Sequence, residues 1–470
     1  MLLEDIMRIG NRREVFWDDT MLDTDPGKTT TVFRLHEPFQ RECVLTLDLP
    51  WDTPPNAYLS VLQDGDLYRM YLRSANLSYA ESRDGIHWER PRLGIVSWNG
   101  STDNNILIDG KAYPFDGTRV FIDENPACPP GERYKLAGSF GPPGKVRLHM
   151  FAGGDGVHFR YLGMVPLEGS FDSVNTVFWN RQTECYQCFF RDFHPSGDPS
   201  YPLRTRDIRF SSSKELFSEA AWTPPKPLVY EQQVDWHMYT NSIMKYYRAD
   251  HVYIGFPARY VERQKWTDNY EELCGLEKRR ERLDPEDPRR ALAVTDTLFM
   301  TSRDGYFWKR YPDAFLRPGP EHPTNWVYGS VYFSNGLVET APSHPGCDRE
   351  LSFYCLENRY SGKPGQVYRY TIRKDGFVSQ YAPYPGGTLT TKKFIFEGKD
   401  LFINFSTSAF GHIDLILEDE SKHRLFARGL FGDSTDRHVR FDGDLSAFAG
   451  KPVTLKAEML DADFYSFKFE

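Results

Sequence analysis

The sequence predicts an all-β protein, built as a five-bladed β-propeller followed by a C-terminal β-sandwich. Two observations carry this prediction: a turn motif that recurs along the chain, and a composition rich in aromatic residues, glycine and proline. Of the 470 residues, 15% are aromatic, 36 are glycine and 32 are proline. Short aromatic strands separated by frequent turns are typical of all-β proteins.

The turn motif reads Ser-Arg-Asp-Gly-x-x-Trp. Its Asp-Gly pair favours a tight turn with positive φ, and its aromatic residue packs on a neighbouring strand. The motif stands at 82–88 and 302–308, weaker copies stand at 154–159 and 374–377, and a degenerate copy stands at 211–217. A hairpin that recurs about every 60–90 residues indicates a repeat architecture. Five copies therefore predict five blades.

Each predicted unit has two inner strands joined by a turn and followed by an outer hairpin. The inner strands are expected at 58–63 and 67–73, 118–125 and 133–139, 173–180 and 185–192, 239–247 and 252–260, and 328–338 and 350–359. Before them, 15–23 reads either as a strand that closes the ring or as a loop that enters the central funnel.

The predicted domains are a propeller at 1–384 and a sandwich at 385–470, because the hairpins stop near Pro385 and alternating strands follow. A charged insertion is expected at 261–292, where a Glu-, Lys- and Arg-rich run is followed by two proline breaks. We interpret this insertion as a solvated, partly helical excursion. The alternative is a lid over a pocket.

Composition excludes several classes of partner. A net charge of −9 argues against binding to a nucleic-acid backbone. No segment has the apolar length of a membrane span, and the start of the chain does not resemble a signal peptide. Seven cysteines, without the spacing of a disulfide framework or a metal site, fit reduced thiols in the cytoplasm. We expect no metal and no cofactor, and a homo-oligomer stays open.

The strand ends predict a rim of polar residues around one mouth of the propeller. If the first strand of each unit begins at the pocket, its antiparallel partner ends there. The second strands of four units end at Arg73, Arg191, Arg259 and Arg359. The first strands begin near Asp116, Asp172, Asn175, His237 and Tyr239. Such side chains suit a sugar, since aromatic rings stack on it and arginine binds its hydroxyls or a carboxylate. Alternatively, the arginines pair with acidic residues and tie neighbouring blades together.

The five hairpins followed by a sandwich resemble the five-bladed glycoside hydrolases of families 32 and 43, in particular bacterial proteins described as family-32-like. Those families use three acidic residues: a nucleophile or base in the first blade, a transition-state stabiliser in the second and a general acid in the third. The resemblance implies that Asp172 is the acid and that Asp116 stands near the second position. The segment 16–19, with Asp19, looks like the first-blade segment, although it departs from the invertase pattern.

Together these observations predict an exo-acting glycoside hydrolase whose substrate is an oligosaccharide, with a furanoside or an acidic sugar at its end. Asp172 is expected to donate the proton, and Asp19, Asp192 or Glu357 to act as base or nucleophile. Two alternatives are a sugar-binding or scaffold protein without catalysis, and a lyase. The lyase would neutralise a uronate with the arginines and use His237 or Tyr239 as base.

Overall fold

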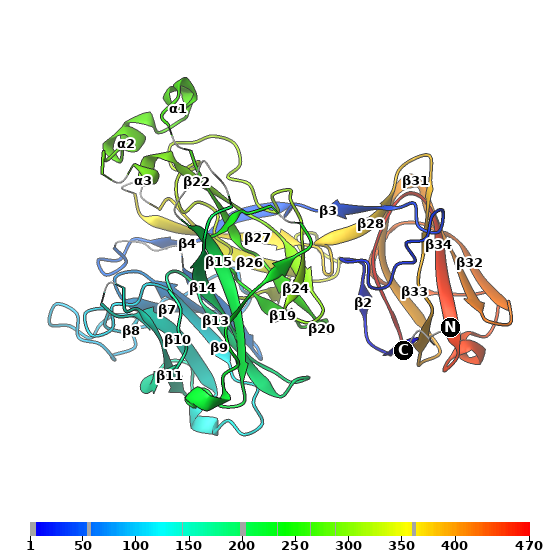
Figure 1. The fold of residues 1–470 in the computed structure, drawn as a ribbon, viewed down its shortest axis with the longest axis horizontal. Coiled ribbons are helices and arrows are strands. Elements are labelled where there is room, and N and C mark those ends of the chain that lie inside the picture. The colour runs from blue at the N-terminus through cyan, green and yellow to red at the C-terminus, as the bar shows by residue number, and fades with distance from the viewer. Residues whose placement is uncertain are drawn as a thin grey trace. The chain divides into compact units, whose positions relative to one another are not determined.

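The computed structural model describes residues 6–53, 58–142, 144–197, 204–232, 234–263, 265–286, 288–359 and 363–470. Strands dominate this part of the chain, which confirms the all-β class (Figure 1). The chain divides into two compact units. Unit 1 comprises the described residues of 1–37, 246–252 and 372–470, and unit 2 comprises those of 38–245 and 253–371.

The first three sheets of unit 2 are four-stranded and follow one another along the chain. The first contains β5 (Leu59–Asp64), β6 (Leu67–Arg73), β7 (Leu77–Ser82) and β8 (Ile106–Ile108). The second contains β9 (Thr118–Ile122), β10 (Tyr134–Phe140), β11 (Arg147–Gly153) and β12 (Arg160–Met164). The third contains β13 (Thr176–Asn180), β14 (Cys185–His194), β15 (Thr205–Ser213) and β16 (Lys226–Pro227). Within each sheet, sequential strands are antiparallel neighbours, as blades require.

The next stretch forms two sheets, one of three strands and one of five, because its long strands are interrupted. One contains β18 (His237–Met238), β21 (Ala258–Glu262) and β22 (Ala293–Thr297). The other contains β17 (Val229–Tyr230), β24 (Phe307–Arg310), β23 (Met300–Ser302), β20 (Ala249–Gly255) and β19 (Met244–Tyr246). At each interruption, the strand before it and the strand after it are consecutive along the chain, and together they correspond to one inner strand of the predicted unit.

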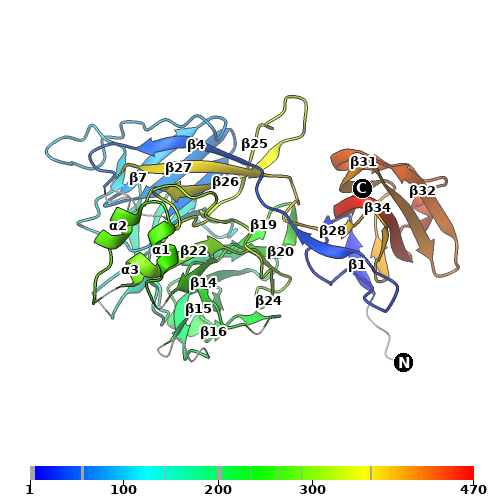
Figure 2. The same ribbon diagram turned by 90° about the horizontal axis from the view of Figure 1, so that it is seen from above.

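The last sheet of unit 2 takes a strand from the beginning of the chain. It contains β25 (Val338–Thr340), β26 (Glu350–Glu357), β27 (Gly365–Ile372) and β4 (Gln40–Leu47). Strand β4 runs antiparallel to β27, which Figure 2 shows as a blue strand beside a yellow one. The strand that joins first and last parts of the chain is thus 40–47, whereas 15–23 lies in unit 1. A closed ring of five blades stays a prediction.

The repeated motif forms the same turn at both of its best copies. Asp84 Oδ1 accepts hydrogen bonds from the backbone N–H groups of Ile86 and His87, and Asp304 does the same in the second copy. The glycine after each aspartate has a φ of 76° or 78°, and the tryptophan indole donates to that glycine's carbonyl. The motif is therefore a structural turn.

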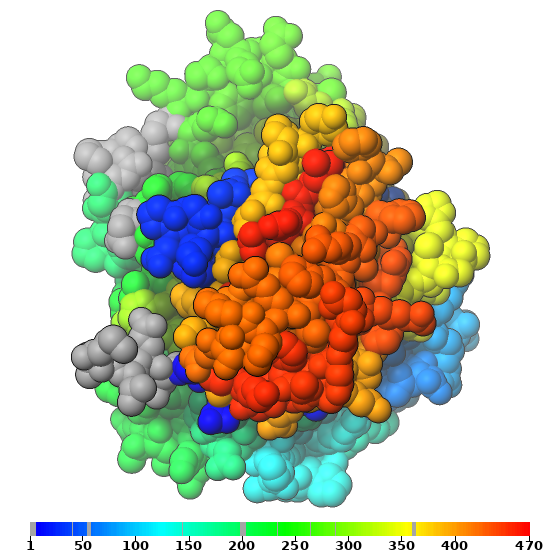
Figure 3. Space-filling view, turned by 90° about the vertical axis from the view of Figure 1, so that its right-hand side faces the viewer, coloured from blue at the N-terminus to red at the C-terminus, as the bar shows by residue number. Residues whose placement is uncertain are grey.

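Unit 1 is built on two long strands, β31 (Leu401–Asp419) and β34 (Pro452–Phe469), which pair antiparallel. The same sheet contains β1 (Met7–Gly10), β2 (Glu14–Val15), β3 (Val32–Leu35), β28 (Val378–Ala382), β29 (Gly387–Thr390), β30 (Phe394–Phe396), β32 (Arg424–Leu430) and β33 (Asp433–Val439). Buried phenylalanine and leucine side chains form its core. Figure 3 shows the C-terminal residues of this unit in orange and red. A β-sandwich stays a prediction.

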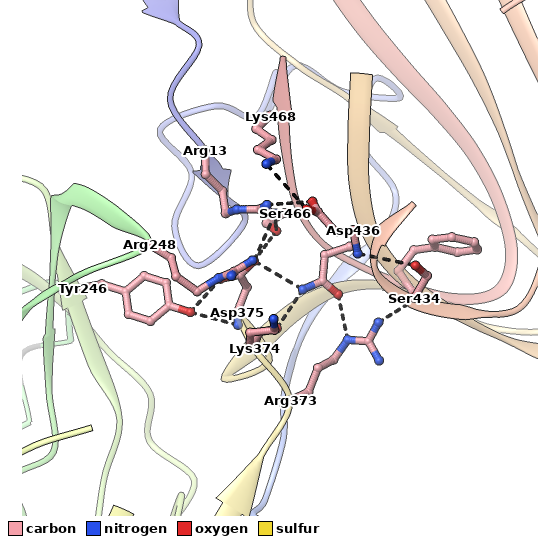
Figure 4. Close-up of polar contacts among 12 residues, drawn as sticks. Arg13, Tyr246, Arg248, Arg373, Lys374, Asp375, Ser434, Asp436, Ser466 and Lys468 are labelled. Atoms are coloured by element: carbon pink, nitrogen blue, oxygen red, sulfur yellow. Dashed lines mark hydrogen bonds and ion pairs between the residues drawn. The ribbon is translucent and has the colours of Figure 1, made fainter. Parts of the chain in front are cut away.

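A buried carboxylate, Asp375, connects separate segments of unit 1. It lies in the weak motif copy at 374–377. Its oxygens accept hydrogen bonds from Tyr246, Arg248 and Ser466, and Arg13 approaches to 3.2 Å (Figure 4). Burial alone would raise the pKa of Asp375, but the two arginines outweigh it and lower that pKa. Asp375 therefore joins distant segments instead of capping a solvent-exposed turn.

These contacts explain why the units divide the chain differently from the predicted segments 1–384 and 385–470. Strands β1 and β2 pair with β30 and β34, so the first 37 residues belong with the C-terminal strands. Arg13, in the same segment, contacts Asp375. These are long-range pairings, which leave no mark in the local sequence pattern.

The insertion contains three short helices, α1 (Asp268–Glu272), α2 (Leu276–Glu281) and α3 (Arg289–Leu292), which lie together in both ribbon views (Figures 1 and 2). Within the insertion, the hydroxyl of Tyr270 donates to the carbonyl of Leu292, and Arg279 connects the insertion to the rest of unit 2 by donating to the carbonyl of Trp326. No helix of the described residues is long and apolar enough to cross a membrane.

Candidate active site

Two carboxyl groups meet where the second and third sheets of unit 2 begin. Asp116 lies just before β9 and Asp172 just before β13. A hydrogen bond joins their side chains, and the backbone N–H of Ser173 donates to Asp116 Oδ2 at 2.9 Å. The Asp172 side chain is 45% exposed, so solvent reaches the pair. The structure thus brings two of the predicted rim residues into direct contact.

The backbone around Asp172 is bent into an unusual shape. Phe171 and Ser173 have φ angles of 48° and 67°, which lie in a backbone region that residues other than glycine rarely adopt. The segment 171–173 packs against Gly117, where an added Cβ would lie 2.0 Å from the Ser173 carbonyl oxygen. Gly117 therefore permits the close approach that joins the two carboxyls.

Asn175 shapes this segment from within. Its amide group donates to the carbonyls of Phe171 and Ser173, and its oxygen accepts the backbone N–H of Arg191. The side chain is buried. The substrate-binding role predicted for Asn175 stays a prediction; in the structure its three hydrogen bonds fix the segment that carries Asp172.

Arg191 holds the Asp172 carboxylate in place. Its guanidinium lies 3.2 Å from Asp172 Oδ2 and also donates to Ser173 Oγ and to the carbonyl of Tyr239. The carbon at its centre lies 4.3 Å from the Tyr239 ring centroid. With its side chain 1% exposed, this arginine is a fixed part of the site.

Four further arginines surround the pair. Arg206 stacks on Tyr260 at 4.4 Å, and Arg289 of the insertion lies 5.9 Å from the Tyr328 ring centroid. Arg73 donates to the carbonyl of Phe115, the residue before Asp116. Arg359 lies 6.0 Å from the ring centroid of Tyr58 and 5.7 Å from that of Tyr328.

These surroundings place the shared proton on Asp116. Burial, the hydrogen bond that protonated Asp116 donates to Asp172, and the negative charge of Asp172 raise the pKa of Asp116 to about 6. Burial would also raise the pKa of Asp172, but Arg191, Asp116, Arg206 and Arg289 outweigh it and lower that pKa. The pair therefore consists of one carboxylic acid and one carboxylate below about pH 6.

Buried tyrosines pack beneath the arginines. Tyr58, Tyr239, Tyr260, Tyr328 and Tyr332 belong to one buried cluster. The hydroxyls of Tyr239 and Tyr328 share a hydrogen bond. Burial is the main cause that raises the pKa of both Tyr58 and Tyr328, so these phenols stay protonated at neutral pH.

His237 lies at the edge of this cluster. Its Nδ1 accepts hydrogen bonds from the backbone and the guanidinium of Arg206, both at 3.2 Å. Burial and the charge of Arg206 lower the pKa of His237 to about 4. The imidazole is therefore neutral at pH 7, and the lone pair of its Nδ1 accepts these hydrogen bonds from Arg206.

Several predicted site residues lie elsewhere. Arg259 pairs with Asp296 and lines a separate cavity of about 430 Å³. Asp192 follows Arg191 on β14, so it points to the opposite face, where Arg209 is 3.5 Å away. Glu357 is buried against Arg41 and Tyr370. Asp19 belongs to unit 1, where its carbonyl accepts from Lys392.

Strand ends could not reveal two of the surrounding residues, Arg206 and Arg289. Arg206 lies on β15, a third strand, whereas Tyr58 begins the predicted strand 58–63 but was not named as a site residue. Arg289 lies in the insertion, where the Arg-Arg pair just before β22 was the only available signal. Among the described residues, no three His, Cys, Asp or Glu side chains form a group that could hold a metal ion.

Comparison with known proteins returns matches only among solved structures. No protein-family model matches the chain, and no curated protein matches it. A family 43 arabinoxylan arabinofuranohydrolase from Bacillus subtilis, crystallised with cellotetraose, is 9% identical and has a TM-score of 0.32, with 89% of this chain and 80% of that one covered.

Two other similar structures also come from enzymes that act on sugars. An exo-β-1,3-galactanase from Phanerochaete chrysosporium, with β-1,3-galactotriose, is 8% identical with a TM-score of 0.38, and the match covers 91% of this chain and 100% of that one. An N-acetylgalactosamine deacetylase from F. plautii, with blood group B trisaccharide, is 10% identical with a TM-score of 0.44, and the match covers 73% and 95%.

Proposed function

We propose that this protein is a glycoside hydrolase whose proton donor is the Asp116–Asp172 pair. One observation carries the proposal: the carboxylic acid of Asp116 is hydrogen-bonded to the carboxylate of Asp172, in a solvent-accessible site that is lined by arginines. Cleavage of an acetal needs a proton for the leaving oxygen and negative charge near the cation that forms at the anomeric carbon. The pair supplies both.

In this mechanism Asp116 has the acid role that the sequence assigned to Asp172. Asp116 protonates the glycosidic oxygen, the bond from that oxygen to the anomeric carbon breaks, and the Asp172 carboxylate stabilises the resulting oxocarbenium ion. Water then adds to the anomeric carbon and returns a proton to Asp116. The products are a reducing sugar and an alcohol, and the pair regains its starting protonation state.

The shared hydrogen bond distinguishes this pair from the usual arrangement. Retaining enzymes separate their two carboxyls by about 5–5.5 Å, and inverting enzymes by about 6.5–9.5 Å. Carboxyls that hydrogen-bond to each other are closer than both. We therefore assign Asp116 and Asp172 to a single acid–base unit, and not to the separate acid and nucleophile of a two-carboxylate enzyme.

Catalysis as a lyase has weaker support. A lyase needs a base, and His237 would have to use the lone pair that Arg206 engages. The Tyr239 hydroxyl is hydrogen-bonded to Tyr328, whose pKa is raised. Neither group is arranged to remove a proton from a sugar carbon. A binding protein without catalysis would keep the arginines and tyrosines but would not need the proton on Asp116.

A panel of nitrophenyl furanosides, pyranosides and uronides tests the proposal. We expect the wild-type protein to cleave at least one, with nitrophenol and a saturated reducing sugar as products. Asp172→Asn should reduce kcat/KM by at least about a hundredfold, since it removes the stabilising charge. Arg83→Gln, which changes an exposed turn residue, is the control. Binding of the same sugars without turnover by any of them would favour the binding protein.

The acid role of Asp116 needs a second comparison. Nitrophenol leaves readily without protonation, whereas a methyl glycoside or an oligosaccharide depends on the acid. Asp116→Asn should therefore lose much more activity on the oligosaccharide than on the nitrophenyl glycoside. Equal losses on both substrates would argue against proton donation by Asp116.

A further inference from the structure

The cavity of about 430 Å³ in unit 2 is separate from the carboxyl pair. It is lined by residues of β21 and β22, by residues of the segment 312–319 and by Trp326. Its volume lies within the range of about 300–1,000 Å³ that is common for small-ligand sites. Arg259 on β21 lines the cavity, whereas the next residue, Tyr260, packs on Arg206 at 4.4 Å. Because successive residues of a strand point to opposite faces, the Arg259 side chain lies on the face of the sheet opposite to Tyr260.

Trp326 is fixed at the wall of this cavity. Its indole Nε1 donates to the carbonyl of Gly319 at 2.9 Å, and Arg279 of helix α2 donates to the carbonyl of Trp326 at 2.8 Å. Its φ of 56° is rare for a residue other than glycine. Trp326 is only half-buried, and among the described residues no aromatic ring or cation stacks on it. The other tryptophans, apart from the buried Trp222, each pack on a ring or an arginine.

A carboxylate and a guanidinium line the same cavity as a fixed pair. Arg259 Nε donates to Asp296 Oδ1 at 3.0 Å, and its Nη2 donates to Oδ2 at 2.5 Å. The Nη1 of Arg259 donates to the carbonyl of Pro312 at 3.0 Å. Both side chains are 19% exposed. A carboxylate oxygen accepts more than one hydrogen bond, and a guanidinium has more N–H groups than these contacts use. The pair can therefore both donate to a ligand and accept from it.

The charges in the cavity favour a neutral ligand. Asp296 neutralises Arg259 within the ion pair. The other charged side chains that line the cavity, Arg263, Asp313 and Arg317, belong to exposed residues, where solvent and salt screen their charge.

We propose that this cavity is a second carbohydrate site, which binds a neutral sugar ring with its C–H face against Trp326 and its hydroxyls on the Arg259–Asp296 pair. A sugar matches this lining, because its ring carbons present apolar C–H groups and its hydroxyls both donate and accept hydrogen bonds. Val261 and Val294 add an apolar wall. The inference goes beyond the proposed function, since the cavity can hold a sugar whether or not the carboxyl pair cleaves one.

Fluorine NMR of protein labelled with 5-fluorotryptophan tests the inference. Trp326→Phe and Trp266→Phe assign two resonances, since Trp266 is a half-buried tryptophan of the same unit that does not line the cavity. The methyl glycosides of β-glucopyranose, β-galactopyranose, β-xylopyranose and α-arabinofuranose would be titrated, with glucuronate and cyclohexanol as the charged and apolar comparisons. We expect at least one neutral glycoside to shift the Trp326 resonance saturably, while the Trp266 resonance stays in place.

Two further substitutions separate this site from the carboxyl pair. Asp296→Asn should weaken the binding at least about fivefold, because hydrogen bonds to a charged acceptor are lost, and calorimetry measures this loss without a fluorine label. Asp172→Asn should reduce hydrolysis but leave the Trp326 response unchanged, so the two proposals can fail separately. No shift with any neutral glycoside, an equal shift with cyclohexanol, or a response to glucuronate alone overturns the inference. Loss of the Trp326 response in Asp172→Asn overturns the separation of the two sites.

Discussion

At the scale of single residues, the candidate site depends on how two aspartates share a proton. Burial raises the pKa of both, but the negative Asp172 is the charged neighbour that raises the pKa of Asp116 further, whereas Asp172 has Arg191 3.2 Å away. Neighbouring charges thus shift the pKa values of the two adjacent carboxyls in opposite directions. Pairs of titratable groups whose pKa values are pushed apart are frequent in active sites.

The pKa of Asp116 can be measured directly. In the wild-type protein, ¹³C NMR of the aspartate carboxyls should show one group that titrates near pH 6. Asp116→Asn should remove this signal. In Asp172→Asn, the neighbouring negative charge that raises the Asp116 pKa is lost, so the midpoint should move to lower pH. A midpoint that stays the same after Asp172→Asn would show that the two carboxyls are not coupled.

Hydrolysis should follow the same proton. Because the acid form of Asp116 is needed, kcat/KM for an oligosaccharide should fall as the pH rises through about 6. Nitrophenyl glycosides should show this decline weakly, since their leaving group needs little protonation. A rate on the oligosaccharide that rises steadily from pH 5 to pH 8 would contradict the acid role.

Gly117 should matter through its lack of a side chain. In Gly117→Ala the new Cβ would clash with the Ser173 carbonyl, so segment 171–173 would have to move and the carboxyl pair would separate. We expect a loss of about 1–3 kcal/mol in the free energy of unfolding and a large drop in kcat. Gly131→Ala is the control, because nothing lies within 4 Å of an added Cβ there.

At the scale of elements, the insertion at 261–292 contributes to the site. Its helix α3 begins with Arg289, whose charge helps to keep Asp172 ionised. The sequence favoured a solvated excursion, and much of the insertion is exposed, but Arg289 and the buried Arg279 give it contacts with the rest of unit 2.

Arg289 and its exposed neighbour Arg290 form a matched pair for mutation. Arg289→Gln should reduce kcat/KM by about tenfold and raise the pKa of Asp172, since one of the charges that stabilise its carboxylate is lost. Arg290→Gln changes the net charge equally and should change neither quantity appreciably. Equal effects of the two substitutions would assign the insertion a general electrostatic role only.

Local patterns predicted the elements well but not their partners. The Asp-Gly turns at 82–88 and 302–308 and the inner strands follow from periodicity and turn chemistry, and both carboxyls were placed at strand starts. Arg259 and Asp192 were misplaced because side chains on a strand alternate between faces, and the strand end alone does not define the face. Strand β4 and Arg289 required long-range pairing, which local patterns do not encode.

At the scale of the molecule, unit 1 combines residues from three distant parts of the chain. Arg13 comes from the beginning, Arg248 from 246–252 and Ser466 from the last strand, and all contact the buried carboxylate Asp375. Around it, Tyr246 packs on Trp17 with ring centroids 4.8 Å apart. A buried charge with several partners is costly to disrupt, because its partners would stay buried without it.

Asp375→Asn should therefore lower the stability of the protein by about 3–5 kcal/mol, measured by urea unfolding. Asp436→Asn, which removes a half-exposed partner of the same Arg13, should cost about 1 kcal/mol or less. Since the folded pKa of Asp375 lies below its unfolded value, its contribution is present above about pH 4 and is lost as the pH falls through the folded pKa. Similar losses in both variants would show that Asp375 is not the central contact.

The most direct test of the whole account is hydrolysis in water enriched in ¹⁸O, with mass spectrometry of the products from an oligosaccharide or uronide substrate. Cleavage by the Asp116–Asp172 pair predicts a saturated sugar with one ¹⁸O at its anomeric carbon in the wild-type protein, and almost none in Asp116→Asn. An unsaturated product, an unlabelled product, or equal labelled product from both proteins would contradict it.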